Sequence, residues 1–142
     1  MGKINAGRVI LGGLLAGLVM NVIDYIVNVP LLGAQWMNET TALHITNMPS
    51  PMMSAMGWIL SDLLLGLIGV WLYAGIRPRF GPGPGTAIKA GLWVWSISAV
   101  AYSSFCFMGL YSHMLVLESA LGGLVAKLAG LWLGAMPYQE NA

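Results

Sequence analysis

Four long apolar stretches divide this chain, and polar or Pro/Gly-rich segments separate them. The stretches cover residues 9–29, 52–76, 87–110 and 112–136. A bilayer core about 30 Å thick requires about 20 helical residues, so each stretch can cross a membrane as a helix. The pattern predicts an all-α protein, an integral membrane four-helix bundle that forms one transmembrane domain over residues 1–142. Residues 30–51 and 77–86 are predicted to be the two longer loops.

Composition supports the same class of protein. Hydrophobic residues make up 58% of the chain, charged residues only 8%, and the mean hydropathy is +0.77, far outside the range of soluble domains. The formal net charge of +1 gives no basic surface for nucleic acid. A single cysteine, Cys106, excludes an intramolecular disulfide and any CxxC motif.

The positive charges predict the orientation of the bundle. Lys3 and Arg8 precede the first span, Arg77, Arg79 and Lys89 surround the second loop, and the other two connections contain no Lys or Arg. By the positive-inside rule, both termini and the loop at 77–86 are cytoplasmic, whereas the loop at 30–51 lies outside. We therefore expect a multi-pass protein of the cell inner (plasma) membrane, in contact with lipid.

Small residues predict where helices pack closely. Gly13 and Gly17 form a GxxxG motif in the first span. The last span carries small residues at steps of four: Gly122, Ala126, Gly130 and Gly134. We expect these two helices to face each other or a second copy of the chain, within a homo-oligomer or a larger membrane complex. Such stripes often serve packing alone.

Five polar residues lie at membrane depth: Asn21, Asp24, Asp62, Glu118 and Lys127. Each ionisable residue costs about 2.5–3.5 kcal/mol at the centre of a membrane helix. Counting along the helices predicts an Asp62–Lys127 ion pair near the midplane. It also predicts a hydrogen-bonded network, nearer the outer surface, that joins Asp24 to Glu118, Asn21 and Ser119. Alternatively, Lys127 extends its stem to the cytoplasmic surface. These residues form a structural polar core, a proton or cation pathway, or a small-molecule or lipid site.

Soft metal ligands gather toward the predicted outer side, and the candidates are His44, Met48, Met52 and His113. Thioether and imidazole groups suit Cu(I), and two histidines can ligate haem, but no spacing here matches a metal motif. Methionines also serve as adaptable packing residues. No GxSxG or HExxH motif occurs. The sequence indicates no particular cofactor and favours a protein that is not an enzyme.

Two segments resemble a known family. "NVPLLGAQWMNE" follows the first span and "TAIKAGLWVW" opens the third. They look like the corresponding segments of small, uncharacterised bacterial four-helix membrane proteins, in which a Pro-Leu-(Phe)-Gly-x-x-Trp-Met segment ends the first helix. The resemblance departs at residues 26–29, where the family has Trp-Tyr-Ser before the proline. It implies the four-helix fold and no particular activity.

Three functions remain open from sequence. The first is a proton-coupled pathway, or a pathway for ions or small solutes, built on the intramembrane carboxylates. The second is an accessory or scaffold subunit that packs against a membrane partner. The third is binding of a soft metal or haem on the outer side.

Overall fold

The computed structural model describes residues 3–45 and 47–140, and its elements are helices. Four are long: α1 (Ala6–Ile26), α3 (Pro51–Phe80), α4 (Pro84–Phe107) and α5 (His113–Ala135). A π-helical turn, η1 (Val27–Leu31), and a short helix, α2 (Gly33–Ala42), lie between α1 and α3. Four helical segments are long and apolar enough to cross a membrane, which confirms the predicted class: an all-helical, multi-pass membrane protein.

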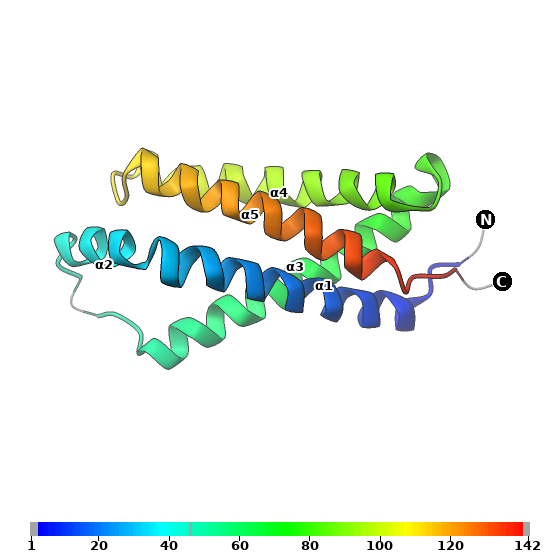
Figure 1. The fold of residues 1–142 in the computed structure, drawn as a ribbon, viewed down its shortest axis with the longest axis horizontal. Coiled ribbons are helices and arrows are strands. Elements are labelled where there is room, and N and C mark those ends of the chain that lie inside the picture. Colours follow the sequence, from blue (N-terminus) through cyan, green and yellow to red (C-terminus); the bar gives the residue numbers. More distant parts are fainter. Residues whose placement is uncertain (1–2, 46, 141–142) are drawn as a thin grey trace.

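The long helices run side by side along one axis (Figure 1). Helix α1 packs mainly against α3 and α5, and α4 packs mainly against α5. Both chain termini lie at one end of the bundle, which we call the terminal end, and α2 lies at the opposite end, which we call the α2 end (Figure 1). Toward the α2 end, α3 diverges from the other helices. Trp58 is accordingly 63% exposed, although it shares a face with the buried Asp62 and Gly66.

The two predicted loops are shorter than the sequence pattern suggested. The first span continues through Pro30 to Leu31, and α2 then makes most of the following segment helical. Proline lacks an N–H and cannot complete an α-helical turn, and here the chain changes to π geometry, with Leu32 N donating to Val27 O at 2.9 Å. At the other loop, α3 extends to Phe80 and only residues 81–83 connect it to α4.

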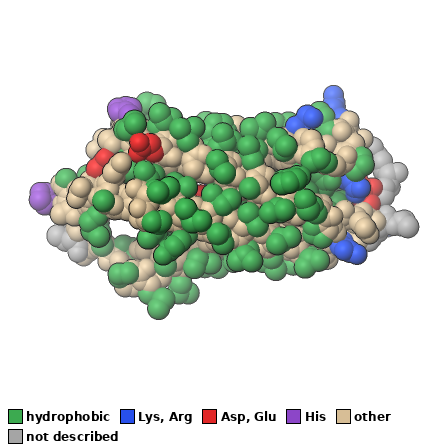
Figure 2. Space-filling model, in the orientation of Figure 1, with side chains coloured by type: hydrophobic (Ala, Val, Ile, Leu, Met, Phe, Trp, Pro, Cys, Tyr) green, Lys and Arg blue, Asp and Glu red, His purple; other side chains and the backbone are tan. Residues whose placement is uncertain are grey.

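Charged and apolar side chains are segregated along the bundle axis (Figure 2). Lys and Arg side chains gather at the terminal end, both histidines lie at the α2 end, and a broad apolar belt separates them on the visible face. This distribution is that of a helix bundle whose middle lies in hydrocarbon and whose two ends lie in water or among headgroups.

Glycines bring α1 against two neighbours at once. A Cβ at Gly66 would touch Gly13 O and lie 2.9 Å from Gly17 Cα, so α1 and α3 meet backbone to backbone. The predicted partner of the GxxxG motif was therefore wrong: Gly13 and Gly17 face α3, not α5. Gly12 and Ala16 form a second line of small residues on α1, one position before Gly13 and Gly17. Side chains one position apart point in different directions, so this second line faces a different helix.

Helix α5 meets that second line of α1. A Cβ at Gly134 would lie 2.6 Å from Ala16 Cβ, and one at Gly130 would lie 2.8 Å from Ala16 O. Gly12 approaches Gly134 equally closely. The expected contact between the first and last spans thus exists. On α1 it is made by Gly12 and Ala16, each one position before the predicted Gly13 and Gly17.

Two other predicted packing residues of α5 lie further toward the α2 end. Gly122 lies against the Val27 side chain, and Ala126 is fully buried. All four predicted small residues of α5 thus lie in the bundle interior or against η1.

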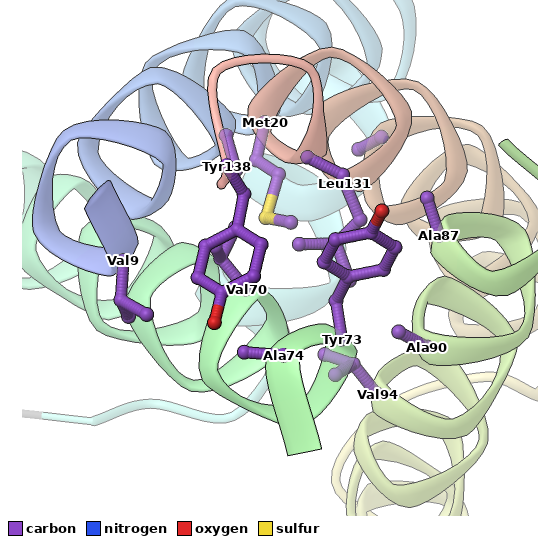
Figure 3. Close-up of a cluster of buried hydrophobic side chains, with 13 residues drawn as sticks. Val9, Met20, Val70, Tyr73, Ala74, Ala87, Ala90, Val94, Leu131 and Tyr138 are labelled. Atoms are coloured by element: carbon purple, nitrogen blue, oxygen red, sulfur yellow. The ribbon is translucent and has the colours of Figure 1, made fainter. Parts of the chain in front are cut away.

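The apolar core occupies the terminal half of the bundle (Figure 3). Met20 of α1, Leu131 of α5 and Val70 of α3 are fully buried there. Tyr73 and Tyr138 pack edge to face, with ring centroids 5.8 Å apart. Alanines of α4 complete the cluster because their small side chains allow α4 to approach closely.

Candidate functional site: an intramembrane charge cluster

Lys127 of α5 lies between two carboxylates deep in the bundle. Its Nζ donates to Asp24 Oδ2 of α1 at 2.7 Å and lies 3.8 Å from Asp62 Oδ1 of α3. The three side chains are only 9%, 20% and 10% exposed for Lys127, Asp24 and Asp62, respectively. We call these three residues the charge cluster. It joins the three helices that form the centre of the fold.

The geometry corrects the predicted pairing of Lys127. Asp62 is near the ammonium group as expected, but the shorter contact is to Asp24. Helical lysine side chains point toward the N-terminus of their helix, and the Nζ accordingly lies near Gly123, one turn before Lys127. This direction leads toward the α2 end and Asp24. The alternative in which Lys127 extends toward the terminal end is therefore wrong.

The expected network between Asp24 and Glu118 does not form in the described structure. Asp24 is engaged by Lys127, while Glu118 Oε2 is buried without a hydrogen-bond partner among the described residues. Counting residues placed Asp24 and Glu118 at similar depth, but it could not show toward which neighbouring helix each side chain points. Ser119, the next residue and part of the predicted network, turns toward η1, where its Oγ donates to Asn28 Oδ1.

Asn21 connects α1 to α3 beside the charge cluster. Its Nδ2 donates to Gly17 O at 2.9 Å within α1 and to Ile59 O of α3 at 3.3 Å. Because the amide binds a main-chain carbonyl of the neighbouring helix, it fixes the register between α1 and α3 without making contact with the charged groups. We assign Asn21 a packing role at this site.

Asn28 in the π-helical turn is the central hydrogen-bonding residue between the charge cluster and the α2 end. Its Nδ2 donates to Asp24 O at 3.0 Å, while its Oδ1 accepts from Trp36 Nε1 at 3.1 Å and Ser119 Oγ at 2.8 Å. The π turn directs this side chain inward. The sequence signal was present, since Asn28 lies one helical turn after Asp24 and two residues before Pro30, but the partners became visible only in the fold.

Aromatic residues cover this polar region at the α2 end. Trp36 packs edge to face with Tyr111 and Tyr102, at centroid distances of 4.9 and 6.3 Å. Thr40 Oγ1 lies 3.3 Å from the Tyr111 hydroxyl. Polar groups therefore lie between the charge cluster and the α2 end, and on the cluster side the Asn28 contact is to the main-chain carbonyl of Asp24.

The other side of the charge cluster is different. Between it and the terminal end lie the close glycine contacts and the apolar core described above. Among the described residues, the polar side chains beside the charge cluster thus lie toward the α2 end.

The predicted soft-metal residues all lie on the surface of the bundle. His44, Met48, Met52 and His113 are exposed near the α2 end, with Met48 and Met52 at 48% and 71%. Among the described residues, no group of three or more His, Cys, Asp or Glu side chains is placed to hold a metal ion. His44 has a positive φ of 49°, which fits the turn that ends α2.

Comparison with known proteins adds no assignment. No protein-family model matches the chain, and no curated protein or solved structure is significantly similar to it. The functional argument therefore rests on the geometry of the charge cluster and its surroundings.

Proposed function

We propose that this protein provides a proton-coupled pathway across the membrane, with the charge cluster as its exchange site. The observation that carries the proposal is the composition of the cluster: two carboxylates share one ammonium group in a buried position. If all three groups are ionised, the cluster has a formal charge of −1, which is costly in a medium of low dielectric constant. Uptake of one proton or one small cation removes that cost.

A proton fits this site better than a hydrated ion. Hydrogen bonds join Thr40 to Tyr111 and Trp36 to Asn28, and Asn28 Nδ2 donates to the main-chain carbonyl of Asp24. The indole and amide groups do not relay a proton themselves, so the proposed transfer runs through bound water beside them, whereas a hydrated cation needs a wider path. The contact between Gly12 and Gly134 closes the terminal half, so release toward that side requires α1 and α5 to separate.

The proposed orientation places the terminal end in the cytoplasm and the α2 end outside. The five basic residues near the terminal end support this orientation by the positive-inside rule. The proposed location is the inner (plasma) membrane of a bacterium, in keeping with the family resemblance. Exchange at the cluster would then begin from the outer side.

The test is proton flux in proteoliposomes that contain only this protein. A pH gradient is applied, the membrane potential is clamped with valinomycin and K⁺, and an enclosed pH-sensitive dye reports the flux. We expect Asp24→Asn to abolish the flux, because the amide cannot exchange a proton. Glu140→Gln is the matched control: it neutralises a carboxylate near the terminal end, paired with Arg77 and away from the charge cluster and the α2 end, and leaves the flux unchanged. Wild-type flux in Asp24→Asn would refute the proposal.

An accessory role in a larger complex is the second candidate. It is favoured by α4, whose outer side is very exposed: Ile97 and Val100 are each 73% exposed and Phe107 is 83% exposed. Purification in mild detergent separates the two functions. One heteromeric partner at fixed stoichiometry, together with no flux from the protein alone, supports the accessory role. A second copy of the chain on this face would instead give a homo-oligomer.

Binding of a soft metal or haem remains the third candidate from sequence, and the described geometry adds nothing to it. Protein purified without added metal should contain stoichiometric copper or show a Soret band if this function is real. Absence of both signals eliminates it.

A further inference from the structure

Helix α2 is attached to the rest of the protein through one of its faces. It contains no fully buried residue, and Met37 is 69% exposed. The side chains that contact other elements are those of Trp36, Glu39 and Thr40. Because positions i, i+3 and i+4 lie on the same side of a helix, these three residues form a single contact face.

The contact face holds α2 against the turn between α4 and α5 (Figure 1). Glu39 accepts two hydrogen bonds from Ser112, one from the main-chain N at 2.7 Å and one from Oγ at 2.6 Å. Thr40 Oγ1 lies 3.3 Å from the Tyr111 hydroxyl. Water can replace polar contacts at a surface with little net loss of free energy. This attachment can therefore break without any change in the apolar core.

Trp36 covers polar groups that lie beside the charge cluster. Its Nε1 donates to Asn28 Oδ1, the same oxygen atom that accepts from Ser119 Oγ. Its ring packs edge to face against Tyr102 of α4 and against Tyr111. Trp36 thus contacts η1, α4 and the turn between α4 and α5 at once. Ser119, which shares the Asn28 oxygen with it, is only 7% exposed.

The segment between α1 and α2 has the features of a hinge. Pro30 in η1 has no main-chain N–H, and the hydrogen bond from Leu32 N to Val27 O closes a π turn. Helices bend at prolines and at π turns. Rotation at η1 moves α2 while α1 keeps its contacts with α3 and α5.

We propose that α2 is a hinged gate between the charge cluster and the α2 end. The described structure is the closed state, with Trp36 on Asn28. In the open state the contact face leaves the turn between α4 and α5, Trp36 withdraws, and water reaches Asn28 and Ser119. Asn28 Nδ2 donates to Asp24 O, so water admitted there lies next to the charge cluster.

The inference rests on the proposed function for its purpose, because the gate regulates access to the same site. Its test measures access of water-soluble reagent and not proton flux. The gate and the proton pathway can therefore fail separately.

A thiol introduced at position 119 reports the state of the gate. Ser119→Cys is made together with Cys106→Ser, because Cys106 is the only cysteine of the chain. The full chain, purified in a neutral maltoside detergent, is treated with a small charged methanethiosulfonate, and intact-mass spectrometry gives the rate of modification. We expect slow modification in this parent protein. Modification as fast as that of an exposed thiol would show that Trp36 does not cover the position and would overturn the proposal.

Neighbouring positions of α2 supply matched variants in this parent. We expect Trp36→Ala to accelerate modification about tenfold or more, since it removes both an aromatic contact and a hydrogen bond. Met37→Ala shortens an exposed side chain on the same helix, and we expect a change of less than about twofold. Equal rates in these two variants would contradict the gate.

Glu39→Gln tests the attachment while Trp36 stays intact. It weakens both contacts with Ser112, so the open state is more populated and modification at position 119 should be about threefold faster or more. Unfolding is monitored with Ala90→Cys in place of Ser119→Cys, because Ala90 is fully buried in the terminal half. If Trp36→Ala makes both positions reactive, it has unfolded the protein, and Glu39→Gln decides: an unchanged rate at position 119 rules out the gate.

Discussion

The contact between α1 and α3 makes a sharp prediction at Gly66. Replacing Gly66 with alanine adds one methyl group to the surface of α3 that faces α1. That Cβ would meet Gly13 O in direct overlap, Gly17 N at 2.5 Å and Gly17 Cα at 2.9 Å. All three obstacles are main-chain atoms. No side chain can rotate away, so the two helices must separate.

The size of the effect follows from this geometry. Overpacking a well-packed interior costs about 1–3 kcal/mol, and rigid backbone on both sides places Gly66→Ala at the upper end. Alanine has a helix propensity better than glycine by up to about 1 kcal/mol, which offsets part of the loss. Separation of α1 and α3 also strains the hydrogen bond from Asn21 to Ile59 O. We expect a net destabilisation of about 2 kcal/mol.

Gly75→Ala is the matched control on the same helix. A Cβ at Gly75 meets nothing within 4 Å, and Gly75 is exposed. The same substitution should therefore be neutral or slightly stabilising there. Free energies of unfolding are measured by reversible denaturation in mixed micelles with increasing mole fraction of dodecyl sulfate, followed by circular dichroism. Equal free energies of unfolding for the two variants would refute the close contact between α1 and α3.

Two more predictions concern polar contacts. Lys127→Met should lower the free energy of unfolding by about 3–5 kcal/mol, because Asp24 and Asp62 then remain buried without a cation; adding Asp24→Asn should recover part of the loss in the same unfolding assay. If the double variant is less stable than Lys127→Met, the ion-pair explanation fails. Glu39→Gln weakens two contacts, from Ser112 N at 2.7 Å and Ser112 Oγ at 2.6 Å, so amide hydrogen exchange at the start of α5 should become faster with little change in overall stability. Unchanged exchange at Ser112 and its neighbours would argue against this tether.

The site was partly predictable from sequence. The proximity of Lys127 and Asp62 was predicted correctly. Residue counting gives the depth of a residue along its helix to within about a turn. The pairing of Lys127 with Asp24 was missed because a lysine stem spans about one further turn, and its direction depends on the rotamer and on neighbouring helices. Glu118 shows a second limit of residue counting. Two residues at similar depth can still point toward different neighbours, as Glu118 and Asp24 do.

The sequence by itself determined the class of this protein. Apolar length, scarcity of charge and the Pro/Gly breaks specify four membrane helices, because a bilayer demands long runs of apolar residues with internally satisfied main chains. Only the tertiary structure decided which faces meet. Gly13 and Gly17 turn toward α3, Gly12 and Ala16 turn toward α5, and the three charges converge from separate helices. Those choices depend on the rotation and register of each helix about its axis, and lipid-facing periodicity constrains both only loosely.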